Sequence, residues 1–380
     1  MKHSNDQPLK ILVFSAKGGG TGCALRAFYI AGAFKKRGHQ ARFVAPIPSL
    51  PLWFDMALST FYYFLVSLLT RSDASIVIKP YPMAVPALWL QRLKGAKVVI
   101  DVDDLDYDYS QGWFRSFHLW LQKPWPSWAD WVTYHNPRLK QPLGDIFKVP
   151  SSKLVQLPQG VDTSLFKPGP SDPSGLPEAV GKLRESKGPL LVFTAHLNVA
   201  CDLEPVLESF KKILASLPQA RLLVAGGGPD ENRFKSLARD LGLADSTTFT
   251  GMISPAQVAS CLGLADAALV YYRDSPVNRH RSSMKLREAL ACGLKVVATR
   301  VGEAALLKSV LYLCDPNPAA FAREVLKALK SKKSSKGAAL LVKKWDWTNC
   351  VKDLETKIYH RQDAKFFGTA PKERGPRKTT

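Results

Sequence analysis

The sequence predicts an α/β protein made of two Rossmann-like domains. Short apolar segments typical of buried strands alternate with helical patterns, and this alternation stops in a stretch rich in Pro, Gly and Ser and then starts again. Such alternation indicates a parallel sheet, and its repetition indicates two of them. A chain of 380 residues is long enough for two domains, because one core rarely grows past about 250–300 residues. The predicted parts are an N-terminal domain over 1–168, a linker over 169–188, a C-terminal domain over 189–345, a helix over 346–361 and a disordered tail over 362–380.

The chain is strongly basic, with 53 Lys and Arg against 32 Asp and Glu, a net charge of +21. This excess indicates an anionic partner, such as nucleotide phosphate, an acidic membrane surface or nucleic acid. Part of it lies between Arg323 and Lys352 and in the tail, where a solvated flank is preferred over a lipid contact. No nucleic-acid-binding module is recognisable, so nucleic acid is not an expected partner.

Cysteine usage and the N-terminus both predict a cytoplasmic protein. The six cysteines are scattered without a C-x-x-C pair, which favours reduced thiols and argues against a zinc site. The polar segment before Lys10 has no signal-peptide pattern. The inner face of the membrane is a further expected location.

The N-terminal half opens with a strand, a glycine loop, a helix and a second strand, the order of a Rossmann-like unit. These are predicted at 10–15, 16–22, 24–37 and 42–45, with further strands at 75–78, 97–100, 128–133 and 154–157. Glycines in such a loop let main-chain N–H groups approach a phosphate. The spacing is not G-x-G-x-x-G, so a nicotinamide site is weakly supported and a packing turn is an equal alternative.

The most apolar segment, Leu52 to Leu69, is predicted as a helix. Only fifteen residues separate Asp55 from Arg71, fewer than the ~20 that span a bilayer. The helix is expected to be mostly core, with an aromatic side in a membrane surface as the alternative.

A run of carboxylates, Asp101 to Asp106, follows the strand at 97–100. Open α/β sheets bind ligands at the carboxyl ends of their strands. Three interpretations stay open for this run: a metal cluster, acceptor binding or a catalytic base, and a hydrogen-bonded turn.

The second half predicts strands at 190–194, 221–225, 247–251, 267–270 and 296–299, and a helix at 203–217. Before the last strand, a loop at 279–282 leads into a helix that Ser282 or Ser283 can cap and Gly293 can end. Lys285 and Glu288 share one face of that helix. Its N-terminus, with basic residues beside it, suits a diphosphate, and Glu288 suits two ribose hydroxyls. An ordinary amphipathic helix with a basic flank is the alternative.

Taken together, these segments resemble the retaining GT-B glycosyltransferases of family 4, the glycosyl transferases group 1. The segments that carry the resemblance are Gly18–Thr21 with Arg37–His39, Leu157–Asp162 with Phe166 and Pro168, Val224–Pro229, Phe249–Gly251, Lys285–Gly293, and Trp347 with Tyr359. The resemblance implies an interdomain cleft, a nucleotide sugar on the C-terminal domain, a glycan or lipid-linked acceptor on the N-terminal domain, and a last helix that crosses back to the first domain.

The resemblance also implies the site residues. Lys285 would meet the diphosphate, Glu288 the ribose, and the loop at Gly251 and Met252 the base, while the Gly18–Thr21 loop approaches from across the cleft. The donor-binding residues expected on this basis are Gly19, Gly20, Thr21, His196, Asn198, Gly251, Met252, Asn278, Ser283, Lys285 and Glu288. The implied reaction is transfer with retention and without a metal, because fixed cations can stabilise the leaving diphosphate. Lys285 and Arg281 would do so, and Asp103 or Asp104 would orient the acceptor hydroxyl.

Three departures from the family pattern motivate an alternative function. His280 stands where the family has Glu, and His196 and Cys201 stand where it has Arg and Lys. The family's histidine after the fourth strand is not found, and the Asp101–Asp104 run lies there. Asn278, Arg281 and Lys285 instead match an Asn-x-x-Arg-x-x-x-Lys pattern of some members. The alternative is a catalytically degenerate protein of the same fold that binds a sugar nucleotide or acts as a scaffold.

Overall fold

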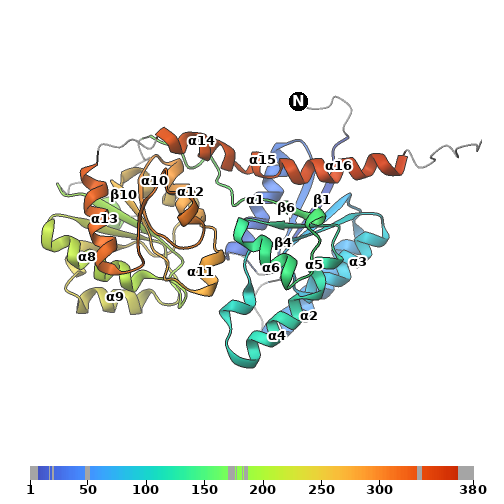
Figure 1. The fold of residues 1–380 in the computed structure, drawn as a ribbon, viewed down its shortest axis with the longest axis horizontal. Helices are drawn as coiled ribbons and strands as arrows, with labels where there is room; N and C mark the ends of the chain where they lie inside the picture. The colour runs from blue at the N-terminus through green and yellow to red at the C-terminus, as the bar shows by residue number, and fades with distance from the viewer. Residues whose placement is uncertain are drawn as a thin grey trace, which may run out of the picture.

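The chain forms two α/β domains that lie side by side along the long axis of the molecule (Figure 1). The computed structural model describes residues 7–16, 18, 21–47, 52–169, 176, 178–181, 183, 187–331 and 336–366. Each domain contains one sheet of six parallel strands. The predicted fold class, two Rossmann-like domains, is therefore confirmed.

The N-terminal sheet has the strand order β2-β1-β3-β4-β5-β6. Its strands are β1 Lys10–Ser15, β2 Gln40–Val44, β3 Ala74–Ile78, β4 Lys97–Val102, β5 Trp131–Tyr134 and β6 Leu154–Gln156. The helices are α1 Gly22–Lys36, α2 Leu52–Leu69, α3 Val85–Leu93, α4 Gly112–Gln122, α5 Pro124–Trp128 and α6 Lys140–Asp145. Alternate residues of β1 enter different cores. Ile11 and Val13 pack with α1, whereas Leu12 and Phe14 pack with α2 and α3. Burial on both faces explains why these strands are continuous apolar runs.

The C-terminal sheet has the order β12-β11-β10-β7-β8-β9. Its strands are β7 Leu190–Thr194, β8 Arg221–Ala225, β9 Thr247–Phe249, β10 Ala267–Val270, β11 Lys295–Thr299 and β12 Tyr312–Cys314. The helices are α7 Glu178–Gly181, α8 Leu203–Ser216, α9 Glu231–Asp240, α10 Pro255–Leu264, α11 Pro276–His280, α12 Met284–Ala291 and α13 Pro318–Lys330. Helices α8, α9 and α13 cover one face of the sheet, and α10 and α12 cover the other.

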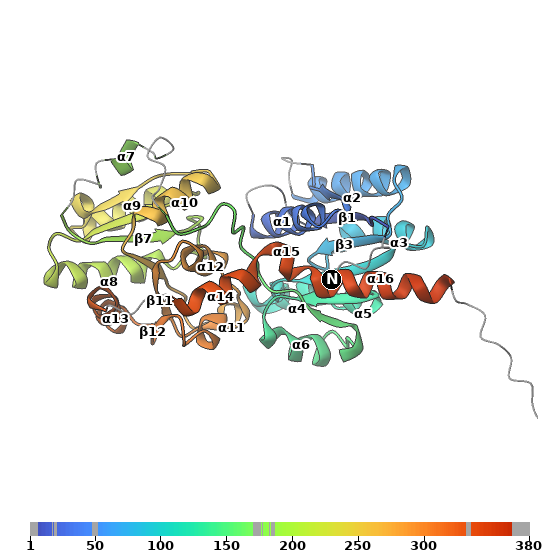
Figure 2. The same ribbon diagram turned by 90° about the horizontal axis from the view of Figure 1, so that it is seen from above.

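The last three helices run across the junction of the two domains, as Figure 2 shows. They are α14 Lys336–Trp345, α15 Trp347–Cys350 and α16 Lys352–Phe366. Val351, Leu354 and Ile358 pack in the same core as β1 and α1, so the expected return of the last helix to the first domain is confirmed. The helix ends at Phe366, five residues beyond the predicted end at 361, because Gln362, Ala364 and Lys365 are good helix formers.

Two predicted local structures differ from those observed. The strand expected at 128–133 begins at Trp131, because Pro124–Trp128 form helix α5 with a proline in its first turn. The loop expected at 279–282 includes the end of helix α11, which Ser275 caps at its N-terminus.

Helix α2 forms at its predicted position and is partly core and partly exposed. Tyr63 and Val66 are buried in the N-terminal core, whereas Phe61, Leu65 and Leu68 are exposed. Within the described part of the chain, no helix has both the length and the apolar content that crossing a membrane requires.

The Pro158-Gln159-Gly160 segment is the place where the returning chain packs most tightly. A Cβ atom added to Gly160 would lie 2.3 Å from the Trp347 ring. Trp347 is buried and stacks on Tyr29 at 5.6 Å between ring centroids. Neither ring has space to move away, so only glycine fits at position 160.

We expect Gly160→Ala to lower the free energy of unfolding by about 1–3 kcal/mol, because the new methyl group overlaps the Trp347 ring. Urea denaturation measures this. The matched control is Gly32→Ala in α1, where an added Cβ meets nothing within 4 Å and a helical alanine stabilises by up to about 1 kcal/mol. Equal stability of the two variants would contradict the packing argument.

Candidate functional site

A cavity of about 540 Å³ lies where the carboxyl ends of the two sheets face each other. The N-terminal wall comes from the residues that follow β3, β4 and β5. The C-terminal wall comes from those that follow β7 and β10 and from the start of α12. Parallel sheets bind ligands at this edge, so the cavity is the first candidate for a ligand site.

The start of α12 is fixed in the C-terminal wall. The Ser283 hydroxyl accepts a hydrogen bond from the backbone N–H of Leu286 and one from the Tyr272 hydroxyl at 3.0 Å. One turn later, the buried guanidinium of Arg287 pairs with Glu303, donating to its Oε2 at 2.7 Å, and donates to the Ser283 carbonyl. This buried pair holds the helix, so its N-terminal dipole points at a constant position.

Two basic side chains extend from this region into the cavity. Lys285 forms no hydrogen bond or ion pair with any described residue and lies 5.6 Å from the centroid of the Phe193 ring. Burial alone would lower the pKa of Arg281, but its interactions with Tyr109, Tyr272 and Asp104 raise it. Arg281 therefore stays a cation, and Lys285 is free to bind an anionic ligand.

Hydrogen bonds join the two walls directly. Arg281 donates to the Tyr109 hydroxyl at 2.7 Å, and that hydroxyl donates to Asp104 at 3.1 Å. The Asn136 amide donates to the carbonyls of His280 and Arg281 at 3.0 and 3.2 Å. A ligand between the domains would therefore contact groups that are already positioned relative to one another.

The N-terminal wall contains a buried lysine among carboxylates. Lys79 follows β3 with a backbone φ of 74°, a region that non-glycine residues rarely occupy. Its ammonium lies 2.5 Å from Asp106, 3.2 Å from Asp103 and 4.0 Å from Asp104. Burial would lower the pKa of Lys79, but these carboxylates raise it well above its usual value. Lys79 is therefore a fixed cation within the acidic wall.

The first carboxylate of the acidic run has a structural role. Asp101 is fully buried and accepts two hydrogen bonds from Arg26, at 2.7 and 2.9 Å. The same guanidinium donates to the Leu157 carbonyl and to Gln159. Among the described residues, no three His, Cys, Asp or Glu side chains are placed to hold a metal ion. Asp101 and Asp106 are each paired with a cation, Arg26 and Lys79, and each accepts a further hydrogen bond from a neutral side chain, Thr133 and Gln122.

Two buried polar atoms of the cavity wall have no hydrogen-bond partner among the described residues: His135 Nδ1 and Gln159 Nε2. The pKa of Asp103 is raised to about 7, first by burial and then by its carboxylate neighbours. Burial and the charges of Arg26, Arg287 and Lys79 lower the pKa of His135, so its imidazole is neutral. Unpaired buried polar groups are costly unless a ligand or water satisfies them. This wall is therefore suited to a ligand rich in hydroxyl groups.

A triple-glycine turn positions the loop after β7. A Cβ atom on Gly226 would lie 2.0 Å from the Ala195 carbonyl, and one on Gly228 would lie 2.3 Å from the Leu197 carbonyl. The close approach keeps His196 and Asn198 in the cavity wall. This explains the Val224–Pro229 motif in terms of packing rather than direct ligand contact.

The structure brings together part of the site expected from the sequence. The expected residues that line the cavity are Thr21, Asp103, Asp104, His196, Asn198, Arg281, Ser283 and Lys285. Gly251, Met252, Asn278 and Glu288 do not line it. Met252 is exposed, and Asn278 is buried and bonded to the Arg273 carbonyl and Asp202. Gly19 and Gly20 lie outside the described residues.

Several residues of the cavity were not expected from the sequence. They are Arg26, Lys79, Tyr109, His118, His135 and Gln159. Lys79 has a sequence signal, because a single charge directly follows the apolar strand 74–78. The others depend on contacts between residues far apart in the chain, and their local sequence contains no such signal.

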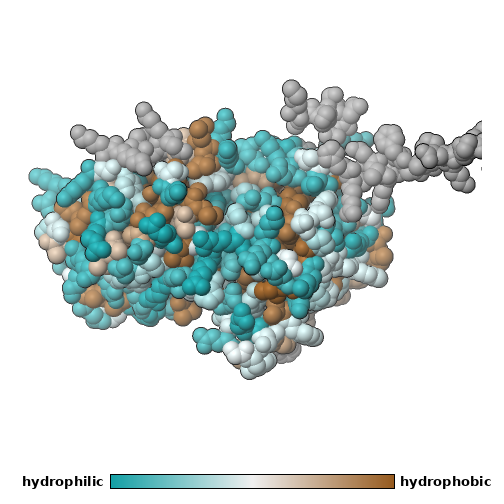
Figure 3. Space-filling model, in the orientation of Figure 1, coloured by the Kyte–Doolittle hydropathy of each residue, from teal (hydrophilic) through white to brown (hydrophobic). Residues whose placement is uncertain are grey.

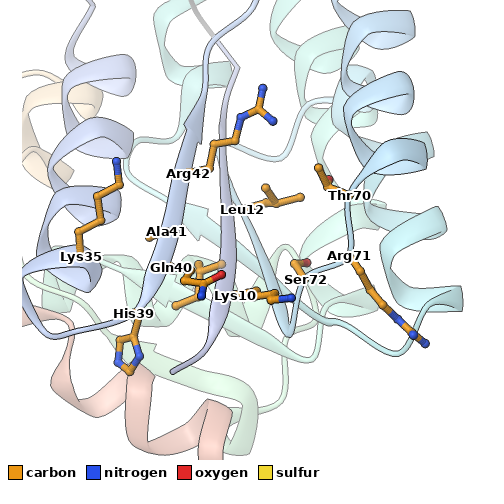
Figure 4. Close-up of a pocket in the computed structure, with 11 residues that line it drawn as sticks. Lys10, Leu12, Lys35, His39, Gln40, Ala41, Arg42, Thr70, Arg71 and Ser72 are labelled. Atoms are coloured by element: carbon orange, nitrogen blue, oxygen red, sulfur yellow. The ribbon is translucent and has the colours of Figure 1, made fainter. Parts of the chain in front are cut away.

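A second pocket, of about 300 Å³, lies at the opposite end of the N-terminal sheet (Figure 4). Lys10, Lys35, Arg42 and Arg71 line it. In Figure 4 the Arg42 and Arg71 side chains point away from each other. The charges therefore do not converge on one anion, and the interdomain cavity is the better candidate.

Comparison with known proteins agrees with this geometry. Residues 178–339 match the family Glycosyl transferases group 1. The match covers most of the C-terminal domain, which is therefore similar to the glycosyl transferases group 1. This domain contains α12, Lys285 and the β7 loop that form one wall of the cavity.

Solved structures show that the whole chain has the GT-B fold. Sucrose-phosphate synthase from Thermosynechococcus elongatus has a TM-score of 0.73 at 17% identity, covering 95% of this chain and 100% of the other. HepE of Anabaena, solved with UDP-glucose, has a TM-score of 0.71 at 16% identity and covers 93% and 100%. The expected GT-B arrangement is therefore confirmed.

Two sequence relatives have names that refer to lipids. A GDP-mannose-dependent phosphatidylinositol monomannoside mannosyltransferase of Mycolicibacterium smegmatis is 29% identical over 182 residues, 46% of each chain. The alpha-monoglucosyldiacylglycerol synthase of Streptococcus pneumoniae is 29% identical over 153 residues, 40% of this chain and 33% of the relative. The chain thus matches less than half the length of these relatives.

Glu288 generates a prediction about pH. Burial raises its pKa to about 7, against the attraction of Lys285. Between pH ~4.5 and ~7 the folded protein therefore keeps a proton that the unfolded chain has released. The contribution of this group to stability falls as pH rises through that window and is constant above it. We expect Glu288→Gln to remove the decline, so that the variant gains on the order of 2 kcal/mol relative to the original chain at pH 8 but not at pH 4.

Urea denaturation at several pH values tests this expectation. Glu208→Gln, an exposed glutamate on α8, is the matched control. An identical pH dependence of stability in the Glu288 variant and the original chain would show that the pKa of Glu288 is not raised in the folded protein.

Proposed function

We propose that this chain is a retaining glycosyltransferase that moves a sugar from a nucleotide diphosphate sugar to an acceptor hydroxyl. The observation that carries the proposal is the unpaired Lys285 at the start of α12, facing the acidic N-terminal wall across the cavity. The similarity of the C-terminal domain to the glycosyl transferases group 1 supports the same assignment.

In this proposal the diphosphate lies against the start of α12. The developing negative charge on the leaving group is stabilised by Lys285, by Arg281 and by the helix dipole, without a metal. Before the substrate arrives, Arg281 is held by Tyr109, and the helix that carries Lys285 is held by the Arg287–Glu303 pair. Little reorganisation is then needed as the glycosidic bond breaks.

The acceptor hydroxyl lies at the N-terminal wall in this proposal. Asp103 lies 3.2 Å from the Lys79 ammonium and has a pKa raised to about 7, so it can accept or return a proton near neutral pH. The neutral His135 and the Gln159 amide supply further partners for sugar or inositol hydroxyls. Asp104 acts indirectly, by orienting Tyr109.

We infer a lipid-linked acceptor and action at the inner face of an anionic membrane in the cytoplasm. The mannosyltransferase and the glucosyldiacylglycerol synthase have lipids in their names, which supports this class. The net charge of +21 favours an anionic surface.

A thermal-shift screen of nucleoside diphosphates and nucleotide sugars tests the donor site. We expect one nucleoside diphosphate to raise the melting temperature, and Lys285→Ala to weaken its binding by about ten- to a hundredfold, because a charge-assisted hydrogen bond to phosphate is lost. Lys330→Ala, an exposed lysine on α13, should bind as the original chain does.

Equal shifts in the original chain and in Lys285→Ala would refute the assignment of Lys285. Nucleotide binding without release of a nucleoside diphosphate from any donor would favour a non-catalytic sugar-nucleotide-binding protein. With the correct donor and acceptor, NMR of the product distinguishes retention from inversion.

A further inference from the structure

Helix α4 exposes an aromatic face that the core does not use. Trp113, Phe114, Phe117 and Trp120 are 66, 53, 42 and 70% exposed. Their rings are in contact along the helix, with centroids 4.0 Å apart for Trp113 and Phe114 and 6.1 Å apart for Phe117 and Trp120. A continuous apolar surface of this kind on a soluble domain marks an interaction site.

The inner side of the same helix reaches the cavity. His118 lines the cavity and is hydrogen-bonded to Ser110 at 2.8 Å. The buried Gln122 amide donates to Asp106, the carboxylate that pairs with Lys79. Helix α4 therefore connects the acidic wall of the cavity with the outer surface.

The surroundings of this face identify the class of partner. Residues 112–123 contain no carboxylate. Arg115 pairs with Asp108 at 3.1 Å and His118 faces the cavity, so Lys123 is the remaining basic side chain of this segment. Tryptophan at both ends of an amphipathic helix, with a basic residue beside it, is typical of helices that lie in the headgroup region of a bilayer. Protein interfaces are also enriched in aromatic side chains, so the oligomeric state of the chain is measured beside its vesicle binding.

The position of the helix supports this assignment. Figure 1 places α4 at the lower end of the N-terminal domain, and in Figure 3 this end projects from the lower edge of the molecule. The C-terminal domain has only scattered exposed large apolar side chains among its described residues: Val199, Met252, Leu306 and Leu340. The apolar contact surface therefore belongs to the side of the cavity proposed for the acceptor.

We propose that α4 docks the protein on an anionic phospholipid bilayer by inserting Trp113, Phe114, Phe117 and Trp120 among the headgroups. Docking through this helix holds the acidic wall of the cavity at the membrane surface, where a lipid-linked acceptor presents its hydroxyls. This inference rests on the proposed function for the nature of the acceptor, whereas the docking itself can be measured independently.

Cosedimentation of the full chain with vesicles tests the proposal. The vesicles contain phosphatidylcholine alone, or phosphatidylcholine and phosphatidylglycerol in equal amounts. We expect binding to the mixed vesicles, and at least about a tenfold loss of binding in Trp113→Ser/Trp120→Ser, because two interfacial anchors are removed. Leu306→Ser/Leu340→Ser, which removes two exposed apolar side chains of the C-terminal domain, should bind like the original chain.

Two further measurements separate the possible results. The nucleotide-induced thermal shift in lipid-free solution should be unchanged in Trp113→Ser/Trp120→Ser, which shows an intact fold and donor site. A chain that binds vesicles through α4 but binds no nucleotide would refute the proposed function and leave the docking surface in place. Light scattering reports whether the aromatic face instead joins two copies of the chain.

Three results would overturn the proposal. The first is vesicle binding by Trp113→Ser/Trp120→Ser equal to that of the original chain. If Leu65→Ser/Leu68→Ser, which removes two exposed apolar side chains of α2, then loses vesicle binding, the membrane contact lies on α2 and not on α4. The second is no binding of the original chain to either vesicle. The third is a dimer in solution that the α4 substitutions dissociate, since the aromatic face would then be a protein interface.

Discussion

The interaction on which the rest of the structure depends is the buried contact of Arg26 with Asp101. One guanidinium, fully buried, joins α1 to the carboxyl end of β4 and to the Leu157–Gln159 segment. Its carbon also lies 5.7 Å from the centroid of the Trp347 ring, on the chain that returns from the C-terminal domain. Breaking a buried pair leaves an uncompensated charge, so these four segments hold a single relative arrangement.

A division of charge between the two domains follows from this arrangement. The C-terminal wall presents cations and a helix N-terminus, and the N-terminal wall presents carboxylates around one buried lysine. Arg281, Tyr109 and Asp104 connect the two walls. In the proposed reaction, cations stabilise the leaving diphosphate, and a carboxylate accepts the proton of the attacking hydroxyl. The C-terminal wall supplies the cations and the N-terminal wall supplies the carboxylates.

Much of the fold could be predicted from the sequence because the strands of parallel sheets are buried on both faces and are therefore apolar throughout. The position of Lys285 could also be predicted, because Ser283, the helical spacing and Gly293 are local signals. The partners of the acidic run could not, since Lys79 and Arg26 are distant in the chain and reach Asp106 and Asp101 only through tertiary packing. For the same reason, local sequence did not reveal that Glu288 and Asn278 are not among the residues that line the cavity.

The close contact of Trp347 with Gly160 has a consequence for how the chain folds during its synthesis. The core of the N-terminal domain includes Val351, Leu354 and Ile358, near the end of the chain. During translation the first domain leaves the ribosome with an apolar groove beside β1 and α1 that stays uncovered until the whole second domain has been made. The core of the N-terminal domain is therefore complete only after the C-terminal domain has been synthesised, and the exposed apolar surface before that point is prone to aggregation.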